Sequence, residues 1–403
     1  MLLALSGLTL KHRRDEVLSN LQTRQIKGIA ILLVVLNHLS VHTVEQASDL
    51  FLFQDSGYIG VILFLILSGF GIAVSLNSRG TEQFWLHRLI RVGIPVLLAM
   101  LLEIALSHLL NLSPDVNPMI RLSQIFFDLQ AVDRNLWFIP FLFFWYFVAY
   151  ILFQTQLSPR LKYWLLFGMP LLLFSLPNPL VWKMSAFGFP VGYWLGEQRL
   201  RQSLSLELLT KQPPVALIGF TLALLSWAVG FHHLPTLLKA SLGLKLVALG
   251  LISLPVGLAV CRYRRMLWRL RFSPNQAALT LAAGFVLLNY NSSLGWESVG
   301  ILLYSATHNL TGIVSFAAVT LLLTLLVKCQ LRSLFLAALG SISFEIYLLH
   351  GMFMYKFDFM LFRGSLWLTF PIYLAAICAG SCCLQRLSAG LANRCLAWLE
   401  PQT

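Results

Sequence analysis

The sequence contains few charged residues. Aspartate, glutamate, lysine and arginine make up only 11% of its 403 residues, whereas about 25% is usual for soluble domains. Hydrophobic residues make up 58%, against roughly 45–50% in such domains. Intrinsic disorder needs the opposite composition, with many charges and little hydrophobicity, so it is excluded. The same composition argues against a soluble globular enzyme.

Cysteine is also sparse. The chain has six cysteines, and none of them stands in a CxxC pair. No His-rich spacing accompanies them either, so the pattern indicates neither a disulfide framework nor a zinc site. We therefore expect no metal in this protein.

The net charge of +13 does not point to nucleic acid. A nucleic-acid interface needs an exposed basic face, and no basic stretch with interleaved aromatics lies outside the apolar blocks. Membrane proteins collect Lys and Arg in their cytoplasmic loops, which is a simpler source of the charge.

Long apolar blocks dominate the chain, and several approach the 20 residues that span a bilayer as a helix. They predict an all-α, polytopic transmembrane bundle. Twelve spans are expected near residues 26–44, 57–76, 89–107, 136–153, 163–177, 181–196, 214–231, 243–260, 275–290, 310–327, 334–355 and 366–385. Three of the blocks, the fifth, sixth and ninth, are short enough for re-entrant or tilted pairs, so ten spans is the alternative.

The distribution of positive charge predicts the orientation. With the N-terminus inside and the spans alternating, 22 of the 29 Lys and Arg residues fall inside and seven fall outside. This bias predicts that both termini are cytoplasmic. We expect an interfacial N-terminal segment over 1–23, one membrane domain over 24–388 and a cytoplasmic tail over 389–403. The largest outer loop is expected over about 108–135.

Two polar residues share one face of the first span. Lys27 and His38 are eleven residues apart, which leaves them about 20° from three full helical turns and roughly 16 Å apart along the axis. A phosphate group held at Lys27 could therefore have a reactive tail that reaches His38. The alternative is a histidine near the outer interface that bonds to a backbone carbonyl.

Two arginines enter the third span together. Arg88 and Arg91 are neighbours at i, i+3, and arginine suits planar, bidentate phosphate contacts. Ordinary positive-inside anchoring is the alternative.

Small residues follow a stripe on the second span. Gly60, Phe64 and Ser68 recur every four residues. Small residues allow membrane helices to approach closely, so packing is the favoured role for the glycines. Ser68 could line a cavity.

The richest polar block lies in the span near 334–355. Ser343, Tyr347 and His350 stand at i, i+4 and i+7 on one helix face, and Ser341 and Glu345 form a second pair. Such residues are costly against lipid, so they are expected to line a cavity inside the bundle.

Taken in order, these blocks resemble the acyltransferase-3 family of integral membrane acyltransferases, many of which O-acetylate glycans. The resemblance covers about residues 20–385 and is carried by Lys27 and His38, then Ser68-Gly69-Phe70, then Phe84, Arg88, Arg91 and Pro95, then Leu136-Trp137-Phe138, and finally Ser343, Tyr347, Leu348 and His350. Lys27 departs from the pattern, because the family more often has Arg there. We expect a stand-alone member with no esterase-like domain after it.

The resemblance implies acyl transfer from cytoplasmic acyl-CoA, expected to be acetyl-CoA, to a hydroxyl of a glycan or lipid-linked sugar on the outer side of a bacterial inner membrane. His38 would be the general base or carry the acyl group transiently, and Glu345, Tyr347 or Ser68 would orient it or stabilise the oxyanion. The implied roles of the other residues are CoA binding for Lys27, Arg88 and Arg91, and substrate binding for Ser68, Trp137, Ser343, Tyr347 and His350.

Two other classes of protein would share the apolar spans. A transporter or flippase of a glycan or lipid explains buried polar groups, but it does not require Lys27 and His38 in register. A structural membrane subunit predicts that replacing His38 leaves function intact.

Overall fold

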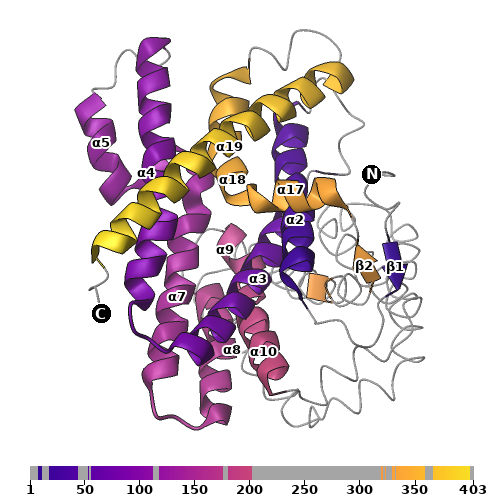
Figure 1. Cartoon of the computed structure of the whole chain (residues 1–403), viewed down its shortest axis with the longest axis vertical. Helices are drawn as coiled ribbons and strands as arrows, with labels where there is room; N and C mark the ends of the chain where they lie inside the picture. The colour runs from indigo at the N-terminus through magenta and orange to yellow at the C-terminus, as the bar shows by residue number, and fades with distance from the viewer. Residues whose placement is uncertain are drawn as a thin grey trace, which may run out of the picture.

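The computed structural model describes residues 8–10, 18–43, 53, 56–111, 118–175, 180–201, 319–320, 323, 329–331, 333–358 and 366–399. Within these ranges the chain is almost entirely helical (Figure 1). The elements are β1 Leu8–Leu10, α2 Asn20–His42, α3 Ser56–Arg79, α4 Phe84–Leu109, α5 Pro118–Phe127, α6 Leu129–Val132, η2 Arg134–Trp137, α7 Phe138–Gln154, α8 Pro159–Ser175, α9 Leu180–Ser185, α10 Gly188–Leu200, β2 Cys329–Leu331, α17 Leu334–Ser341, α18 Ser343–Tyr355 and α19 Leu366–Leu399.

The predicted helical membrane bundle is confirmed. Five helices in the described part of the chain are long and apolar enough to cross a membrane, and α17 with α18 makes a sixth if that bent pair is one span. One small strand pair is added, because Leu8–Leu10 lies antiparallel to Cys329–Leu331. The predicted spans near 214–231, 243–260 and 275–290, and most of 310–327, lie outside the described residues, so the choice between ten and twelve spans stays open.

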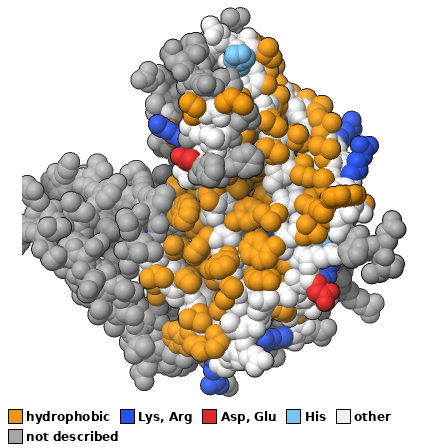
Figure 2. Space-filling view, turned by 90° about the vertical axis from the view of Figure 1, so that its left-hand side faces the viewer, with side chains coloured by type: hydrophobic (Ala, Val, Ile, Leu, Met, Phe, Trp, Pro, Cys, Tyr) orange, Lys and Arg blue, Asp and Glu red, His pale blue; other side chains and the backbone are white. Residues whose placement is uncertain are grey.

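Large apolar side chains on the outer faces fit a lipid environment. Leu97 and Leu101 of α4, Phe147 of α7, and Leu368 and Leu387 of α19 are exposed. Figure 2 shows a broad apolar surface on the side where α4 and α5 lie, with most charged groups near its margins. A soluble protein rarely exposes so wide an apolar surface. The protein is a multi-pass membrane protein.

Helix α2 begins at a capping box. The Ser19 hydroxyl accepts from the Gln22 backbone N–H at 3.4 Å, and the Gln22 side chain accepts from the Ser19 N–H at 3.3 Å. This pairing satisfies donors that a helix start leaves free. It sets the helix that carries both Lys27 and His38.

Glycines bring the central helices into backbone contact. A Cβ at Gly60 of α3 would collide with the Ala30 carbonyl oxygen of α2, and one at Gly192 of α10 would collide with the Ile66 carbonyl oxygen of α3. Close approach of this kind is the usual use of small residues in membrane helices. The glycine at 60 therefore packs, as the stripe on the second span predicted.

The predicted span near 334–355 is broken, contrary to the single helix expected there. Helices α17 and α18 meet at Ile342 with a bend of 74°. On one side of this bend α17 packs closely against α2, where a Cβ at Gly340 would overlap the Arg24 carbonyl oxygen and one at Gly28 would overlap that of Leu336. On the other side α18 begins at Ser343 and carries His350, whose ring lies 5.0 Å from that of His38 on α2.

Helix α19 closes one side of the bundle. It packs against α4 and α18 and crosses them obliquely in Figure 1. It also continues through position 388, where the predicted membrane domain ends, to Leu399.

Candidate functional site

A cavity of about 300 Å³ lies among α2, α3, α4, α7 and α18. Its walls are mostly apolar, with a few convergent polar groups, which is the usual composition of a ligand site. The lining side chains are Lys27, Val34, Val61, Phe64, Leu67, Ser68, Gly71, Arg88, Val92, Phe138, Leu142, Tyr146, Ser343, Phe344 and Tyr347. Five residues that the sequence singled out are therefore brought to one space: Lys27, Ser68, Arg88, Ser343 and Tyr347.

Two cations line this cavity. Lys27 comes from α2, and Arg88 comes from the first turns of α4. The Arg88 guanidinium lies 5.5 Å from the ring centroids of both Phe84 and Tyr146. These aromatic faces favour the cation and hold it in one orientation. Arg91 lies beside Arg88 but is exposed, and it does not line the cavity.

A pair of hydroxyls stands next to Arg88 within the cavity. The Ser68 Oγ and the Tyr146 hydroxyl are 3.0 Å apart. Tyr146 thus joins α3, α4 and α7 at one point, since it bonds Ser68 and also faces Arg88. One hydroxyl donates to the other, so the pair has one O–H left to donate to a ligand.

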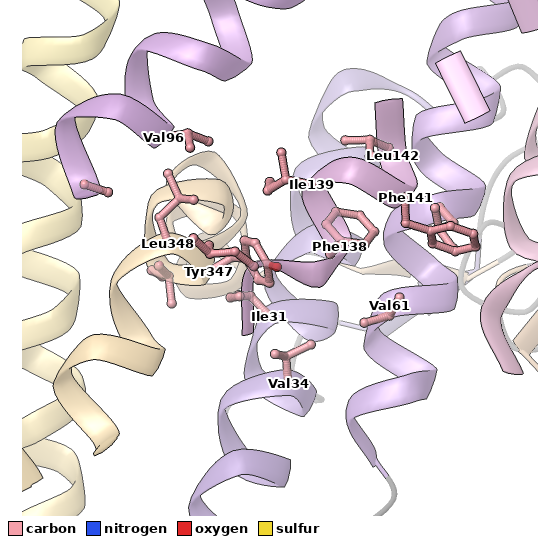
Figure 3. Packing of buried hydrophobic residues seen from close by; sticks show 14 of the residues in the cluster. Ile31, Val34, Val61, Val96, Phe138, Ile139, Phe141, Leu142, Tyr347 and Leu348 are labelled. Carbon is pink, nitrogen blue, oxygen red and sulfur yellow. The ribbon is translucent and has the colours of Figure 1, made fainter. Parts of the chain in front are cut away.

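Helix α18 supplies two further polar groups to the cavity. The Ser343 Oγ donates to the Gly340 carbonyl at 3.0 Å, across the break between α17 and α18. The Tyr347 hydroxyl donates to the Asn135 carbonyl, and its ring packs 5.6 Å from that of Phe138. Figure 3 shows Tyr347 reaching from α18 towards Phe138 among the buried apolar residues.

A cluster of imidazole and phenol groups lies further along α2 and α18. His38 Nδ1 is 2.9 Å from the Tyr355 hydroxyl, and the His38 ring is 5.0 Å from the His350 ring. His350 is fully buried, and its Nδ1 lies 2.7 Å from the Tyr347 carbonyl oxygen. Because a carbonyl only accepts, the proton of His350 is on Nδ1.

The cavity and the histidine cluster are joined along one helix. Lys27 and His38 both belong to the unbroken α2, so the axial offset of roughly 16 Å holds. Val34 lines the cavity one turn before His38, and Tyr347 lines it one turn before His350. A ligand held by the cations could therefore extend towards the histidines.

The structure does not gather every residue that the sequence proposed. Glu345 is buried and interacts electrostatically with Lys27, and among the described residues no hydrogen bond joins it to His38. Trp137 ends η2 with its ring near Phe138 and Phe141, and it does not line the cavity. No contact in the described residues therefore supports the predicted role of Glu345 in orienting His38.

The sequence patterns did not predict three polar residues of the site: Tyr146, Tyr355 and Asp133. A tyrosine within the aromatic run of residues 141–147 was a weak signal for Tyr146. Tyr355 follows the last polar motif and reads as an interfacial anchor. Asp133 falls in the stretch that was expected to be an outer loop.

Comparison with known proteins identifies a family for this chain. No curated protein and no solved structure matches the chain. A family model described as an acyltransferase domain, that of the acyltransferase-3 family, matches residues 24–274, which is more than half of the chain. The match includes the helices that carry Lys27, His38, Ser68 and Arg88. This chain therefore belongs to the acyltransferase-3 family.

Proposed function

We propose that this protein moves an acyl group, expected to be acetyl, from cytoplasmic acyl-CoA to a hydroxyl on the outer side of a bacterial plasma membrane. The acceptor is a glycan or a lipid-linked sugar. One observation carries the proposal: a cavity with Lys27 and Arg88 in its wall leads along α2 towards His38. Acyl transfer from CoA would use the cations for the CoA phosphates and a base for the acceptor hydroxyl.

Lys27 and Arg88 would hold the phosphates of CoA. Arg88 offers a planar set of donors that suits phosphate oxygens, and its stacking on Phe84 and Tyr146 orders it before the ligand arrives. Glu345 would hold Lys27 in place rather than act at His38. The apolar side chains between the cations and Tyr347 would take the less polar arm of CoA.

His38 would act as the general base. Tyr355 engages Nδ1, so Nε2 is left for chemistry. When Nδ1 donates to the Tyr355 oxygen, Nε2 carries the lone pair. It would take the proton of the acceptor hydroxyl as that oxygen attacks the thioester carbonyl.

The remaining steps close the proton balance. Attack forms the new C–O bond, and collapse of the tetrahedral intermediate breaks the C–S bond. The proton on His38 then passes to the leaving thiolate and yields free CoA and the ester. The hydroxyls of Ser68, Tyr146, Ser343 and Tyr347 line the cavity, and the group that donates to the oxyanion would come from among them.

Replacing His38 tests the proposal. In His38→Ala, acyl-CoA-dependent ester formation on surface glycans and lipids should fall at least about a hundredfold, as expected for loss of a general base. Mass spectrometry of the esters at matched expression is the measurement. His108→Ala is the matched control, since His108 is an exposed histidine in the last turn of α4 and does not line the cavity.

Each outcome of this experiment tests a different part of the proposed function. Esters present with wild type and His108→Ala but lost with His38→Ala support the proposal and identify the acceptor. Esters that persist in His38→Ala rule out His38 as the base. An absence of esters even with wild type would rule out the acyl transfer proposed here and favour transport of a glycan or lipid.

A further inference from the structure

Asp133 is a buried carboxylate close to the histidine cluster. It precedes η2, where its Oδ1 accepts from the backbone N–H and the side-chain amide of Asn135 at 2.8 and 2.9 Å. Only 8% of the residue is exposed. Its second oxygen, Oδ2, is buried and has no hydrogen-bond partner among the described residues.

Gly351 allows this carboxylate to lie directly against α18. A Cβ at position 351 would come within 2.6 Å of Asp133 Oδ2. Asp133 also interacts electrostatically with His350, Tyr347 and Tyr355. The acid therefore faces the side of α18 that carries the histidine cluster.

The other carboxylates at this end already have cationic or imidazole partners. Lys356 donates to Glu103, which is fully buried, and His42 contacts Asp358. Within the ranges that the structure describes, Asp133 forms no ion pair. A buried charge without a partner is costly, so a positive charge near it is favoured.

A protonated imidazole of the histidine pair would supply such a charge. The His350 Nε2 is buried without a hydrogen-bond partner among the described residues, and its ring lies 5.0 Å from that of His38. When His38 takes a proton, a cation appears in an environment of low polarity. An imidazolium there needs a nearby negative charge.

We propose that Asp133 is the counter-ion of the histidine pair and stabilises the imidazolium that forms when His38 accepts the proton of the acceptor hydroxyl. Asp133 acts across His350 and is a positioning residue, since it does not contact His38. The inference rests on the proposed function for the origin of the proton. The electrostatic coupling itself can be measured without acyl transfer.

Other titratable and charged groups also lie at this end of the bundle. Those on the packed elements are His42 from α2, Glu103 from α4, Arg134 from η2, Tyr347, His350 and Tyr355 from α18, Lys356 and Asp358 after it, and Tyr373 from α19. The test must therefore change Asp133 alone.

Asp133→Asn is the test variant, because Asn keeps the side-chain oxygen that caps η2 and removes the charge. Diethyl pyrocarbonate reacts with neutral imidazole, so the pH dependence of His38 labelling in the purified full-length protein reports its protonation. Peptide mass spectrometry follows the label, with His87 on α4 as internal reference. The midpoint for His38 should move to lower pH by at least about 0.5 pH unit, since a charge that favours the protonated ring is gone.

Kinetics add a second readout. The kcat for acyl transfer should fall about ten- to a hundredfold with KM for acyl-CoA within about twofold, because Asp133 supports the base and not the phosphate site. The acid limb of the pH–rate profile should move in the same direction as the labelling midpoint. Asp128→Asn, an exposed acid five residues earlier, should change neither.

An unchanged His38 midpoint in Asp133→Asn would overturn the inference, whatever happens to the rate. A lower kcat with an unchanged pH dependence would also overturn the inference, because it would leave Asp133 only the structural role of capping η2. If Asp133→Asn does not fold, Asp133→Ser provides the same test with another good capping residue. A shifted midpoint in a protein that shows no acyl transfer would uphold the coupling and reject the proposed function instead.

Discussion

At the scale of single residues, the site separates two kinds of chemistry. Fixed cations stand in the cavity wall at Lys27 and Arg88, and groups able to exchange protons gather around His38. Apolar side chains lie between them. With this separation, anions can bind at Lys27 and Arg88 while His38 stays distant from their negative charge.

Arg88→Lys tests the value of the guanidinium at this scale. Lysine keeps the charge but loses the bidentate geometry and the stacking on Phe84 and Tyr146. We expect the KM for acyl-CoA to rise about tenfold, with kcat changed by less than about threefold. Initial rates against acyl-CoA concentration check this.

Arg91→Lys is the matched control for Arg88→Lys. Arg91 is exposed and does not line the cavity. The KM of Arg91→Lys for acyl-CoA should therefore stay near that of wild type. A larger rise in KM for Arg91→Lys than for Arg88→Lys would contradict the assignment of Arg88 to the phosphate site.

At the scale of elements, backbone contacts between helices set the geometry. Gly188, Gly192 and Gly196 place α10 against the carbonyls of α3, and Gly28 with Gly340 places α17 against α2. The second contact lies next to the bend at Ile342, and beyond this bend α18 also packs against α2. Glycine contacts therefore adjoin the helices that carry the histidine cluster.

Gly192→Ala should destabilise the α3–α10 contact. The added methyl group meets the Ile66 carbonyl, and such overpacking costs about 1–3 kcal/mol. Thermal unfolding in detergent, followed by tryptophan fluorescence, should show a lower Tm than wild type.

Gly168→Ala on α8 is the control for this contact. A Cβ at Gly168 meets nothing within 4 Å, and alanine favours a helix over glycine by about 1 kcal/mol. Its Tm should be unchanged or higher. Equal losses of Tm in the two variants would show that the α3–α10 contact is not the cause.

At the scale of the whole molecule, the bundle has two chemically different ends. Arg79 ends α3 and Arg88 lies in the second turn of α4 at the end that holds Lys27, whereas α4 ends at Leu109 on the opposite side. The positive-inside rule therefore predicts that the Lys27 end is cytoplasmic. That orientation gives acyl-CoA access to the cations and an outer acceptor access to His38.

Single cysteines in a cysteine-free background test this orientation. Ser78→Cys, beside the turn between α3 and α4, should react with a membrane-impermeant maleimide only after the cells are permeabilised. Leu110→Cys, just after α4, should react in intact cells. Both positions are exposed. The reverse pattern would invert the topology and reject cytoplasmic acyl-CoA as the donor for this cavity.

Much of the fold and part of the site could be predicted from the sequence. Helix periodicity and apolar length need no tertiary information, so α2, α3, α4 and α7 fall close to their predicted spans. The register of Lys27 with His38 follows from helix geometry alone. Residues whose role depends on a partner from another helix, such as Tyr146 and Tyr355, carry no such local signal.

The sequence by itself determined the membrane class, the helical bundle and the motifs of its family, because these depend on composition, on periodicity along one helix and on the order of short patterns. Only the tertiary structure decided that Arg88 and not Arg91 lines the cavity, that Glu345 faces Lys27, and that Asp133 lies against Gly351. These are contacts between segments that are distant in sequence. They are set by how closely the helix backbones can approach, and pattern along a single helix does not record that distance.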